Sequence, residues 1–495
     1  MIYEHVRMKW LGGVLLLVIV SSCTKPNPQS CVDGLCTDQR FPFCDVEGTL
    51  GGEAQECIAV VCTPDEFASC RGDQEVRCNT TGNNYDLVQC ELGCSAATDG
   101  CRLCEPNETR CTNGKVATCD ANGAVAASET CELGCFEDKP RCRRLDPSNG
   151  LGSYLDLPAT LPDLDLTDAF FDTGTGTVSA NGGLVIPVPS FSAGNGDGPT
   201  IRVFVANNVR LNNAAAGSGL DPNRQSGPAF ALVARGEIVI EGRFVVYATA
   251  GGIKNAMCAG GIGNYFETDS AYRALASGGG ANATAGGKGG DISGLAGGAG
   301  GQEFGTDVLV PLKGGCPAGG VDINGTVFPY STPGGGAAQF SSEKKITILG
   351  IIDARGQTGT AEQAGNLGAA IYGGGAGGSI LLEAATLTLG PAAILMAKGG
   401  GGGSYGPSTV SDDTASPDKG NVCAGTCPDG GDGAAPGVPA KPGESSPVNV
   451  GSALISGGGG GGIGRVRINT RDTMYQRPNT VVEAAMVTTG LIKTR

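Results

Sequence analysis

The feature that most constrains the fold of this chain is a tandem repeat of cysteines. Residues 62–103 contain six cysteines separated by 7, 7, 11, 3 and 6 residues, and residues 104–142 contain six separated by 6, 7, 11, 3 and 6 residues. The sequence Cys-Glu-Leu-Gly-Cys at residues 90–94 recurs at residues 131–135. A module of about 40 residues buries too little apolar surface to fold by that alone. The spacing therefore predicts two small modules held together by disulfides.

The first 23 residues resemble a bacterial lipoprotein signal. The apolar run at residues 11–20 is shorter than the roughly 20 residues that span a bilayer, and its length suits a signal peptide. The run ends in Val-Ser-Ser-Cys at residues 20–23, which is similar to a lipobox. The resemblance implies that residues 1–22 are removed, that Cys23 is lipidated and that residues 23–30 are a tether. No Asp follows Cys23, so we expect a membrane-anchored protein at the outer membrane and cell surface.

The remaining cysteines are predicted to form disulfides rather than zinc sites. Residues 31–61 carry four of them and form a predicted leader module with two disulfides. No Cys-x-x-Cys pair of the kind typical of zinc sites occurs within a module, and export places the chain in an oxidising compartment. Six cysteines allow 15 pairings, so the connectivity stays open. The candidate disulfide residues are Cys31, Cys36, Cys44, Cys57, Cys62, Cys70, Cys78, Cys90, Cys94, Cys101, Cys104, Cys111, Cys119, Cys131, Cys135, Cys142, Cys258, Cys316, Cys423 and Cys427.

Composition excludes several classes of function. The only His and the only Trp are His5 and Trp10, within the predicted signal peptide, so the mature chain has no His for acid–base catalysis or for binding a metal. The formal net charge of −15 disfavours nucleic acid as a partner. No cofactor and no metal site are expected. The one candidate ion is Ca²⁺, at the carboxylates within residues 163–168 or at Gly-Gly-Lys-Gly-Gly-Asp, residues 286–291.

The rest of the chain is predicted to be a glycine-rich β domain. Residues 143–175 lose cysteine and gain Pro, Asp and Leu, which indicates an acidic linker. Residues 176–495 alternate short β-branched runs with glycine tracts, and Ile-x-Ile-x-Gly at residues 238–242 recurs at residues 346–350. Short strands with glycine corners favour a mainly β fold resembling a parallel β-helix, with a β-sandwich as the alternative.

The glycine tracts are expected to be loops on one side of that domain. Disulfides between Cys258 and Cys316, by elimination, and between Cys423 and Cys427 would close loops that have little core. The tracts concerned are Gly251–Gly301, Gly373–Gly378, Gly399–Gly403 and Gly457–Gly462.

Lipobox, cysteine repeat and glycine-rich β tail together resemble uncharacterised surface lipoproteins of myxobacteria-like genomes. We expect a structural or adhesive surface protein that binds extracellular matrix, glycan or protein. The alternative is a carbohydrate-active enzyme, a polysaccharide lyase or hydrolase on a β-helix, for which Asp353 and Arg355 at a predicted corner are the candidate residues. A corner salt bridge between these two, or simple solvation, is the simpler interpretation. Of these two hypotheses, the structural or adhesive protein is favoured over the enzyme.

Overall fold

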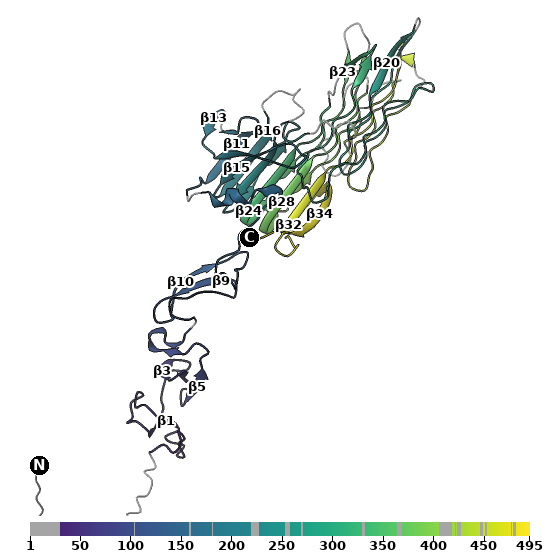
Figure 1. Cartoon of the computed structure of the whole chain (residues 1–495). Coiled ribbons are helices and arrows are strands. Elements are labelled where there is room, and N and C mark those ends of the chain that lie inside the picture. The colour runs from purple at the N-terminus through teal and green to yellow at the C-terminus, as the bar shows by residue number, and fades with distance from the viewer. Residues whose placement is uncertain are drawn as a thin grey trace, which may run out of the picture. The chain divides into compact units, whose positions relative to one another are not determined.

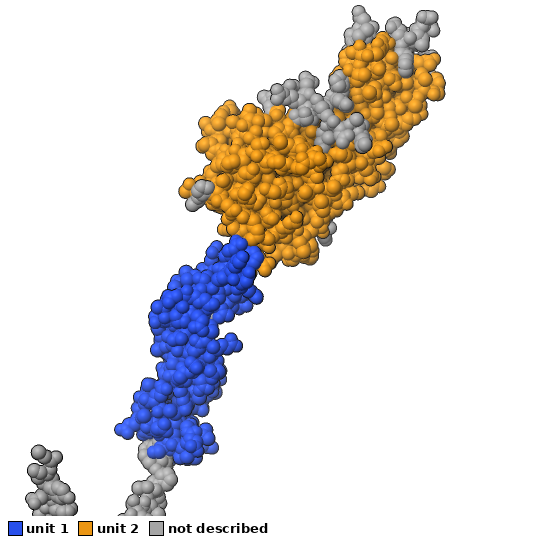
Figure 2. All heavy atoms as spheres, in the orientation of Figure 1, with its two compact units in different colours: residues 1–130, 136–141 blue, residues 131–135, 142–495 orange. Residues whose placement is uncertain are grey.

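The structure, a computed structural model, is mainly β (Figure 1) and divides into two compact units (Figure 2). Unit 1 comprises Met1–Thr130 and Phe136–Arg141, and unit 2 comprises Cys131–Cys135 and Cys142–Arg495. The residues that the structure describes are 30–102, 104–157, 160–180, 182–218, 227–252, 258–268, 271–328, 332–363, 369–404, 418–420, 422, 427–445, 449–450, 453–476, 478 and 482–495. No α-helix occurs among them. The short 3-10 segments are η1 (Ala96–Thr98), η2 (Ser148–Gly150) and η3 (Gly152–Asp156).

Unit 1 is built from short antiparallel strands around very small cores. Phe43, Val60 and Val76 are buried together, and the ring of Tyr85 packs edge-on against Phe43 with centroids 5.1 Å apart. Cores of this size cannot offset the loss of chain entropy on folding. The strands are β1 (Phe43–Asp45), β2 (Glu56–Ile58), β3 (Phe67–Arg71), β4 (Gln74–Cys78), β5 (Tyr85–Gln89), β6 (Cys94–Ser95), β7 (Gly100–Cys101), β8 (Thr109–Thr112), β9 (Lys115–Cys119) and β10 (Val125–Thr130).

Disulfides supply the missing stability, and the prediction of a disulfide-rich, cysteine-repeat protein is confirmed. In the first six-cysteine module the first cysteine pairs with the third, the second with the fifth and the fourth with the sixth. These bonds are Cys62–Cys78, Cys70–Cys94 and Cys90–Cys101. The second module has the equivalent bonds Cys104–Cys119 and Cys131–Cys142. Its second and fifth cysteines, Cys111 and Cys135, are also disulfide-bonded.

Unit 2 contains a curled sheet in which 16 strands are described (Figure 1). They are β11 (Leu164–Asp172), β12 (Thr177–Ala180), β13 (Leu184–Ile186), β14 (Ser190–Ala193), β15 (Ile201–Ala206), β16 (Val209–Gly217), β17 (Ala229–Ala234), β18 (Ile238–Ile240), β19 (Arg243–Val246), β24 (Ala337–Ile348), β25 (Ile351–Asp353), β28 (Ser379–Leu389), β29 (Ile394–Met396), β32 (Arg465–Thr470), β33 (Val482–Ala484) and β34 (Met486–Leu491).

Successive passes of the chain add parallel strands to this sheet at three places. The first ladder stacks β15, β17, the starts of β24 and β28, β32 and β34. The second stacks the starts of β11 and β16, then β18 and the ends of β24 and β28. The third stacks the ends of β11 and β16, then β19, β25, β29 and β33. This parallel pairing differs from the antiparallel pairing expected of the alternative β-sandwich.

Alternation along the strands sends one set of side chains into the curl of the sheet. Five phenylalanines are fully buried there, in a chain with only 5% aromatic residues. Their ring centroids lie 5.1–6.2 Å from those of their neighbours, within the range of favourable aromatic contacts. Each buried ring contributes about 1.5–3 kcal/mol, so this cluster is a major part of the core. The five are Phe171, Phe204, Phe230, Phe244 and Phe340.

The stretch 143–175, expected to be a solvated acidic linker, is instead part of unit 2. Leu145, Leu151 and Leu155 are fully buried against the outer face of the first ladder. Strand β11 follows and pairs in parallel with β16. The sequence Leu-Asp-Leu at residues 164–166 has the period of two that a strand requires, because the leucines face the core and the aspartate faces solvent. The acidic composition of residues 143–175 favours a linker, although the alternation at residues 164–166 favours a strand.

The glycine tracts pack together into one body, called here the glycine bundle, instead of forming loops on one side. Its tracts run side by side between the curled sheet and the end that carries β20 and β23 (Figure 1). Most of its glycines are buried and are joined by backbone hydrogen bonds to other tracts. It is therefore a core made of backbone. The bundle comprises residues 276–301, 314–320, 332–336, 354–360, 372–378, 397–404, 427–445 and 456–464.

Hydrogen bonds in the bundle change direction with a period of three residues. In the tract 456–464, the amides of Gly458 and Gly461 both donate to the tract 397–404, and the amides one residue later both donate to the tract 276–301. Three residues per turn without internal hydrogen bonds is the geometry of polyproline II. The backbone groups that such a chain normally gives to water are here satisfied by neighbouring tracts.

Smaller sheets lie at the end of the bundle away from the curled sheet (Figure 1). Tyr265, Val321, Ile371 and Tyr372 are buried between them. The larger sheet contains β20 (Gly263–Thr268), β21 (Ala271–Ala274), β22 (Val321–Ile323), β23 (Thr326–Phe328), β30 (Asn449–Val450) and β31 (Ala453–Ile455), and the smaller contains β26 (Ala361–Gln363) and β27 (Ala369–Ile371). They are called the distal sheets below.

Candidate functional site

A charged hollow opens beside the third ladder of unit 2, where strands give way to glycine tracts. It has a volume of about 520 Å³, within the roughly 300–1,000 Å³ of small-molecule sites. Its walls come from β19, the end of β25 and the residues that follow these strands. We call it the arginine pocket, and its lining includes Arg243, Tyr247, Asp353, Arg355, Gln357 and Asp418.

Strand alternation explains why these side chains meet outside the core. Phe244 is fully buried inside the curl, so its neighbour Arg243 points to the outer face. On the adjacent strand Ile352 is buried inside, which turns Asp353 outward. The two strands are in parallel register with Val245 beside Asp353, so Arg243 lies one diagonal step from that carboxylate.

A buried carboxylate holds two guanidinium groups at the pocket. Arg243 Nη2 donates a hydrogen bond to Asp353 Oδ2, and Arg355 Nε lies 3.3 Å from the same oxygen. The backbone N–H of Arg355 donates to Asp353 Oδ1 at 3.1 Å. The side chain of Asp353 is only 2% exposed, whereas those of Arg243 and Arg355 are 44% and 21% exposed. Asp353 therefore positions two cations whose outer surfaces face the hollow.

A second ion pair lies deeper. Lys398 Nζ is 2.6 Å from Asp418 Oδ1, and the two side chains are 0% and 3% exposed. Burial raises the pKa of Asp418, and the hydrogen bond from Lys398 opposes that shift. Because neither group is open to solvent, this pair serves as a support beneath the pocket.

Sequence reasoning found part of this pocket. Asp353 and Arg355, singled out as a corner salt bridge or a catalytic pair, do form an ion pair at the end of β25. The repeat at residues 238–242 and 346–350 could have located Arg243, because aligning its two copies places β19 beside β25. The residues of the site that the sequence did not indicate are Arg243, Tyr247, Gln357, Lys398 and Asp418.

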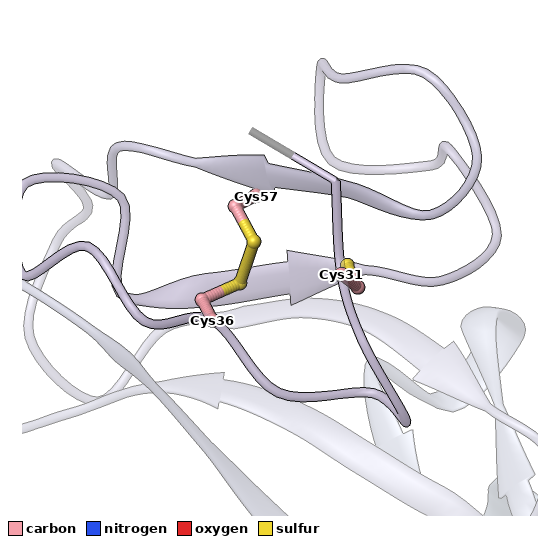
Figure 3. Close-up of side chains that lie close together, drawn as sticks. All are labelled: Cys31, Cys36 and Cys57. Atoms are coloured by element: carbon pink, nitrogen blue, oxygen red, sulfur yellow. A yellow bond between two sulfur atoms is a disulfide. The ribbon is translucent and has the colours of Figure 1, made fainter. Parts of the chain in front are cut away.

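The cysteine clusters of unit 1 are crosslinks. Cys31, Cys36 and Cys57 lie close enough to surround one ion, but Cys36 is bonded to Cys57 (Figure 3) and Cys31 is bonded to Cys44. A metal ligand is a thiolate, and a disulfide sulfur is not one. A second cluster also contains a disulfide, between its two cysteines. It consists of Glu75, Cys90 and Cys101.

The other cysteines singled out from the sequence lie partly beyond the described residues. Cys258 and Cys316 are joined and both are fully buried, and Cys316 lies in the tract 314–320 of the glycine bundle. Cys427 is disulfide-bonded, and its expected partner Cys423 lies outside the described residues. The expected lipidation residue Cys23 lies outside them as well.

Two of the candidate Ca²⁺ carboxylates, Asp163 and Asp291, have partners within the protein. Asp163 accepts hydrogen bonds from the side chains of Asn207 and Asn208 at 2.8 and 2.9 Å. Together with the backbone N–H of Asn208, they hold the pKa of Asp163 below its usual value. Asp291, at the end of the glycine motif, pairs with Lys288 at 2.7 Å.

No family model, no curated protein and no solved structure matches this chain. Among the described residues, no helix is long and apolar enough to cross a membrane.

Proposed function

We propose that this chain is a lipid-anchored protein of the outer membrane and cell surface, with a structural or adhesive role in binding extracellular matrix, glycan or protein. In this proposal Cys23 carries the lipid, and unit 1 is a disulfide-stapled spacer between the anchor and unit 2. The observation that carries the proposal is the glycine bundle. The interior of this body is mainly backbone, and its hydrogen bonds fix the distal sheets to the curled sheet.

Two further features support an extracellular setting. Eight disulfides are described, and such bonds persist in oxidising compartments outside the cytosol. The acidic net charge of −15 keeps a surface protein soluble and discourages binding to nucleic acid. We also propose that the curled sheet is a parallel β-helix, a scaffold supported by the three parallel ladders that recur through successive passes of the chain.

Substitution of the anchor residue tests the proposal. Cells that produce the full chain should be labelled by an antibody without permeabilisation and should adhere to matrix-coated surfaces. The variant Cys23→Ser should appear in the medium, and its cells should lose that adhesion, whereas the control Ser22→Ala keeps a small residue before the cysteine and should behave as the parent. Equal retention of all three proteins, or adhesion that does not depend on the chain, would contradict the proposal.

A second candidate is a carbohydrate-active enzyme, favoured by the meeting of Asp353 and Asp418 at one pocket and by the raised pKa of Asp418. A carboxyl group that keeps its proton can act as a general acid in glycoside cleavage. Both side chains are nearly closed to solvent, which favours binding over catalysis. Release of reducing ends or unsaturated products from polysaccharide, abolished by Asp418→Asn, would establish the enzyme instead.

A further inference from the structure

We infer that β34 pairs with β34 of a second copy of this chain, so that two molecules join antiparallel about a two-fold axis at Thr489. This inference goes beyond the proposed surface function and depends neither on the lipid nor on a ligand. It rests on an open strand edge in unit 2 and on how closely a second β34 fits that edge.

The outer edge of β34 carries backbone groups that the described chain leaves without partners. β34 is the last strand of the first ladder, lies at the border of the curled sheet (Figure 1) and pairs only with β32 among the described strands. The amides of Met486 and Ile492 donate to carbonyl groups on the β32 side, and in a parallel strand every second residue faces the same neighbour. The odd-numbered residues between them therefore direct their N–H and C=O groups away from β32, where no described residue hydrogen-bonds to them: Val487, Thr489 and Leu491.

The same edge is already filled a little further along the chain. Asp146 N donates to Lys493 O at 2.9 Å, and Arg144 and Arg495 exchange backbone hydrogen bonds of 3.0 Å each. The segment that makes these bonds runs antiparallel to this end of the chain. An additional strand on the edge must therefore end level with Ile492.

A second β34 has the length that this open stretch requires. Antiparallel pairing places outward-facing residues opposite each other, and a two-fold axis at Thr489 then puts Val487 of each copy opposite Leu491 of the other. In this register Met486 of the second copy lies level with Ile492 of the first. The second copy is clear of the row beyond that level, because the bend before β34 takes its chain to β33 in the third ladder. A longer strand would run into the segment already bound there, so the fit favours a second copy over an arbitrary peptide.

The side chains that meet in this register are apolar on both faces of the strand. Leu491 is 62% exposed and shares the inner face with its counterpart Val487, which packs against the core of the curled sheet. Met486 is 42% exposed on the outer face, and its counterpart Ile492 packs against the leucines beside the first ladder. Pairing therefore covers the two large apolar side chains that β34 leaves exposed, and it adds cross-strand contacts to the hydrogen bonds.

Charge does not oppose contact at this edge. The formal charge of −15 makes two copies repel each other over much of their surface. β34 has no charged residue, no proline and an unbroken register, so it lacks the usual devices that keep strand edges apart. The strand at the opposite end of the first ladder, β14, is different, since Pro187 and Pro189 precede it. The edge of β34 is thus open to a second copy where the rest of the surface discourages self-association.

Sedimentation velocity on the unlipidated full chain, Cys23→Ser, measures self-association without detergent. One strand pair is a small interface, so we expect a dissociation constant of roughly 10–100 µM. Thr489→Pro in this background should stay monomeric, because proline removes the outward N–H and is tolerated on a free strand edge. Thr489→Val is the matched control, since it keeps the N–H and should dimerise as the parent does.

A charge on the strand provides a second, independent variant. Leu491→Lys should weaken the dimer by at least roughly tenfold, because pairing would bury the lysine against Val487 of the other copy. Leu184→Lys is its control, since Leu184 is also 62% exposed but lies on β13 at another edge. A parent that is still monomeric at roughly 1 mM overturns the inference, and so does dimerisation that neither Thr489→Pro nor Leu491→Lys weakens.

Single cysteines test the register. In Thr489→Cys the two new thiols meet at the axis, with Cα atoms about 5.5 Å apart, which a disulfide can bridge. In Leu491→Cys they lie four residues apart along the strands, about 13 Å, which a disulfide cannot bridge. Thr489→Cys should therefore oxidise to a covalent dimer, and Leu491→Cys should not. Crosslinking of Leu491→Cys that is as fast as that of Thr489→Cys overturns the inference.

Discussion

Replacing Gly461 with alanine tests whether the glycine bundle is held by backbone contact. Gly461 is buried, its N–H donates to Gly400 O at 2.8 Å and its carbonyl accepts from Ala434 N at 2.8 Å. A Cβ added at Gly461 would lie 2.0 Å from Gly375 O. Ordinary contact begins at 3.4 Å, so the tract that contains Gly375 would have to withdraw by 1.4 Å (3.4 minus 2.0).

That withdrawal has a defined cost. Overpacking by one methyl group in a well-packed core costs about 1–3 kcal/mol when side chains can rotate away. Here the obstacle is a carbonyl that accepts a hydrogen bond from Gly400 N at 2.9 Å, so the movement also stretches that bond. Alanine at an unstrained site stabilises by about 0.4–1 kcal/mol, which offsets only part of the loss. We expect the free energy of opening the bundle to fall by about 2 kcal/mol, which is roughly a 30-fold change in the opening equilibrium.

Hydrogen exchange measured by mass spectrometry on the full chain reports this opening locally. Peptides that cover residues 397–404 and 456–464 should exchange roughly 30-fold faster in Gly461→Ala, while peptides from the curled sheet change less. The control is Gly194→Ala, because Gly194 is exposed, has no left-handed φ and has no atom within 4 Å of an added Cβ. Bundle protection in Gly461→Ala equal to that in Gly194→Ala would refute the reasoning.

Three further predictions concern stability, each measured as a melting temperature. Replacing both Cys258 and Cys316 with serine opens a loop of 58 residues, and the chain-entropy cost of about 4 kcal/mol should lower the melting temperature in the absence of reductant; an unchanged value would contradict it. Burial raises the pKa of Asp418 above its usual 3.8. The folded protein therefore keeps this proton over a pH range in which the unfolded chain has lost it. The contribution of Asp418 to the free energy of unfolding should fall as the pH rises from 3.8 through the folded pKa. Asp418→Asn should remove that decline, and an identical pH profile would count against it. Glu343→Gln should cost roughly 1–3 kcal/mol, because Arg144 donates to both oxygens of Glu343 at 2.7 and 2.8 Å; a melting temperature equal to that of the parent would show that the pair contributes nothing.

The disulfide modules were predictable because their signal lies in local spacing. Each described bond of the two six-cysteine modules closes 11 to 24 residues, within the length of one repeat. The connectivity was not predictable, since spacing alone does not say which of 15 pairings brings two Cβ atoms to bonding distance. Strand β11 illustrates a conflict between two local signals, because the acidic composition of residues 143–175 favours a linker whereas the alternation at residues 164–166 favours a strand.

The glycine bundle could not be predicted from the tracts one at a time. Glycine in a single sequence indicates freedom of the backbone, and freedom suggests loops. What orders the tracts is close approach to partners far along the chain, such as the hydrogen bonds from Gly374 N to Gly459 O at 2.8 Å and from Gly462 N to Gly280 O at 2.9 Å. Only glycine permits this approach, as at the crowded axis of collagen. The hydrogen bonds of the bundle have a three-residue period, whereas the sequence has no strict three-residue repeat that would indicate it.

The same geometry limits where this protein can recognise a ligand. Inside the bundle an added Cβ would meet backbone at about 2 Å at Gly377, Gly400, Gly443 and Gly461, so side chains that bind ligands are confined to its surface and its ends. The arginine pocket lies at one such end, where β19, the end of β25 and the residues that follow these strands line it. Gly334 and Gly356 form part of its wall, so a charged site is bounded by backbone that cannot move aside. A substitution that loosens the bundle near Gly356 should therefore disturb the contacts of Arg243 and Arg355 with Asp353 without replacing any of these three residues.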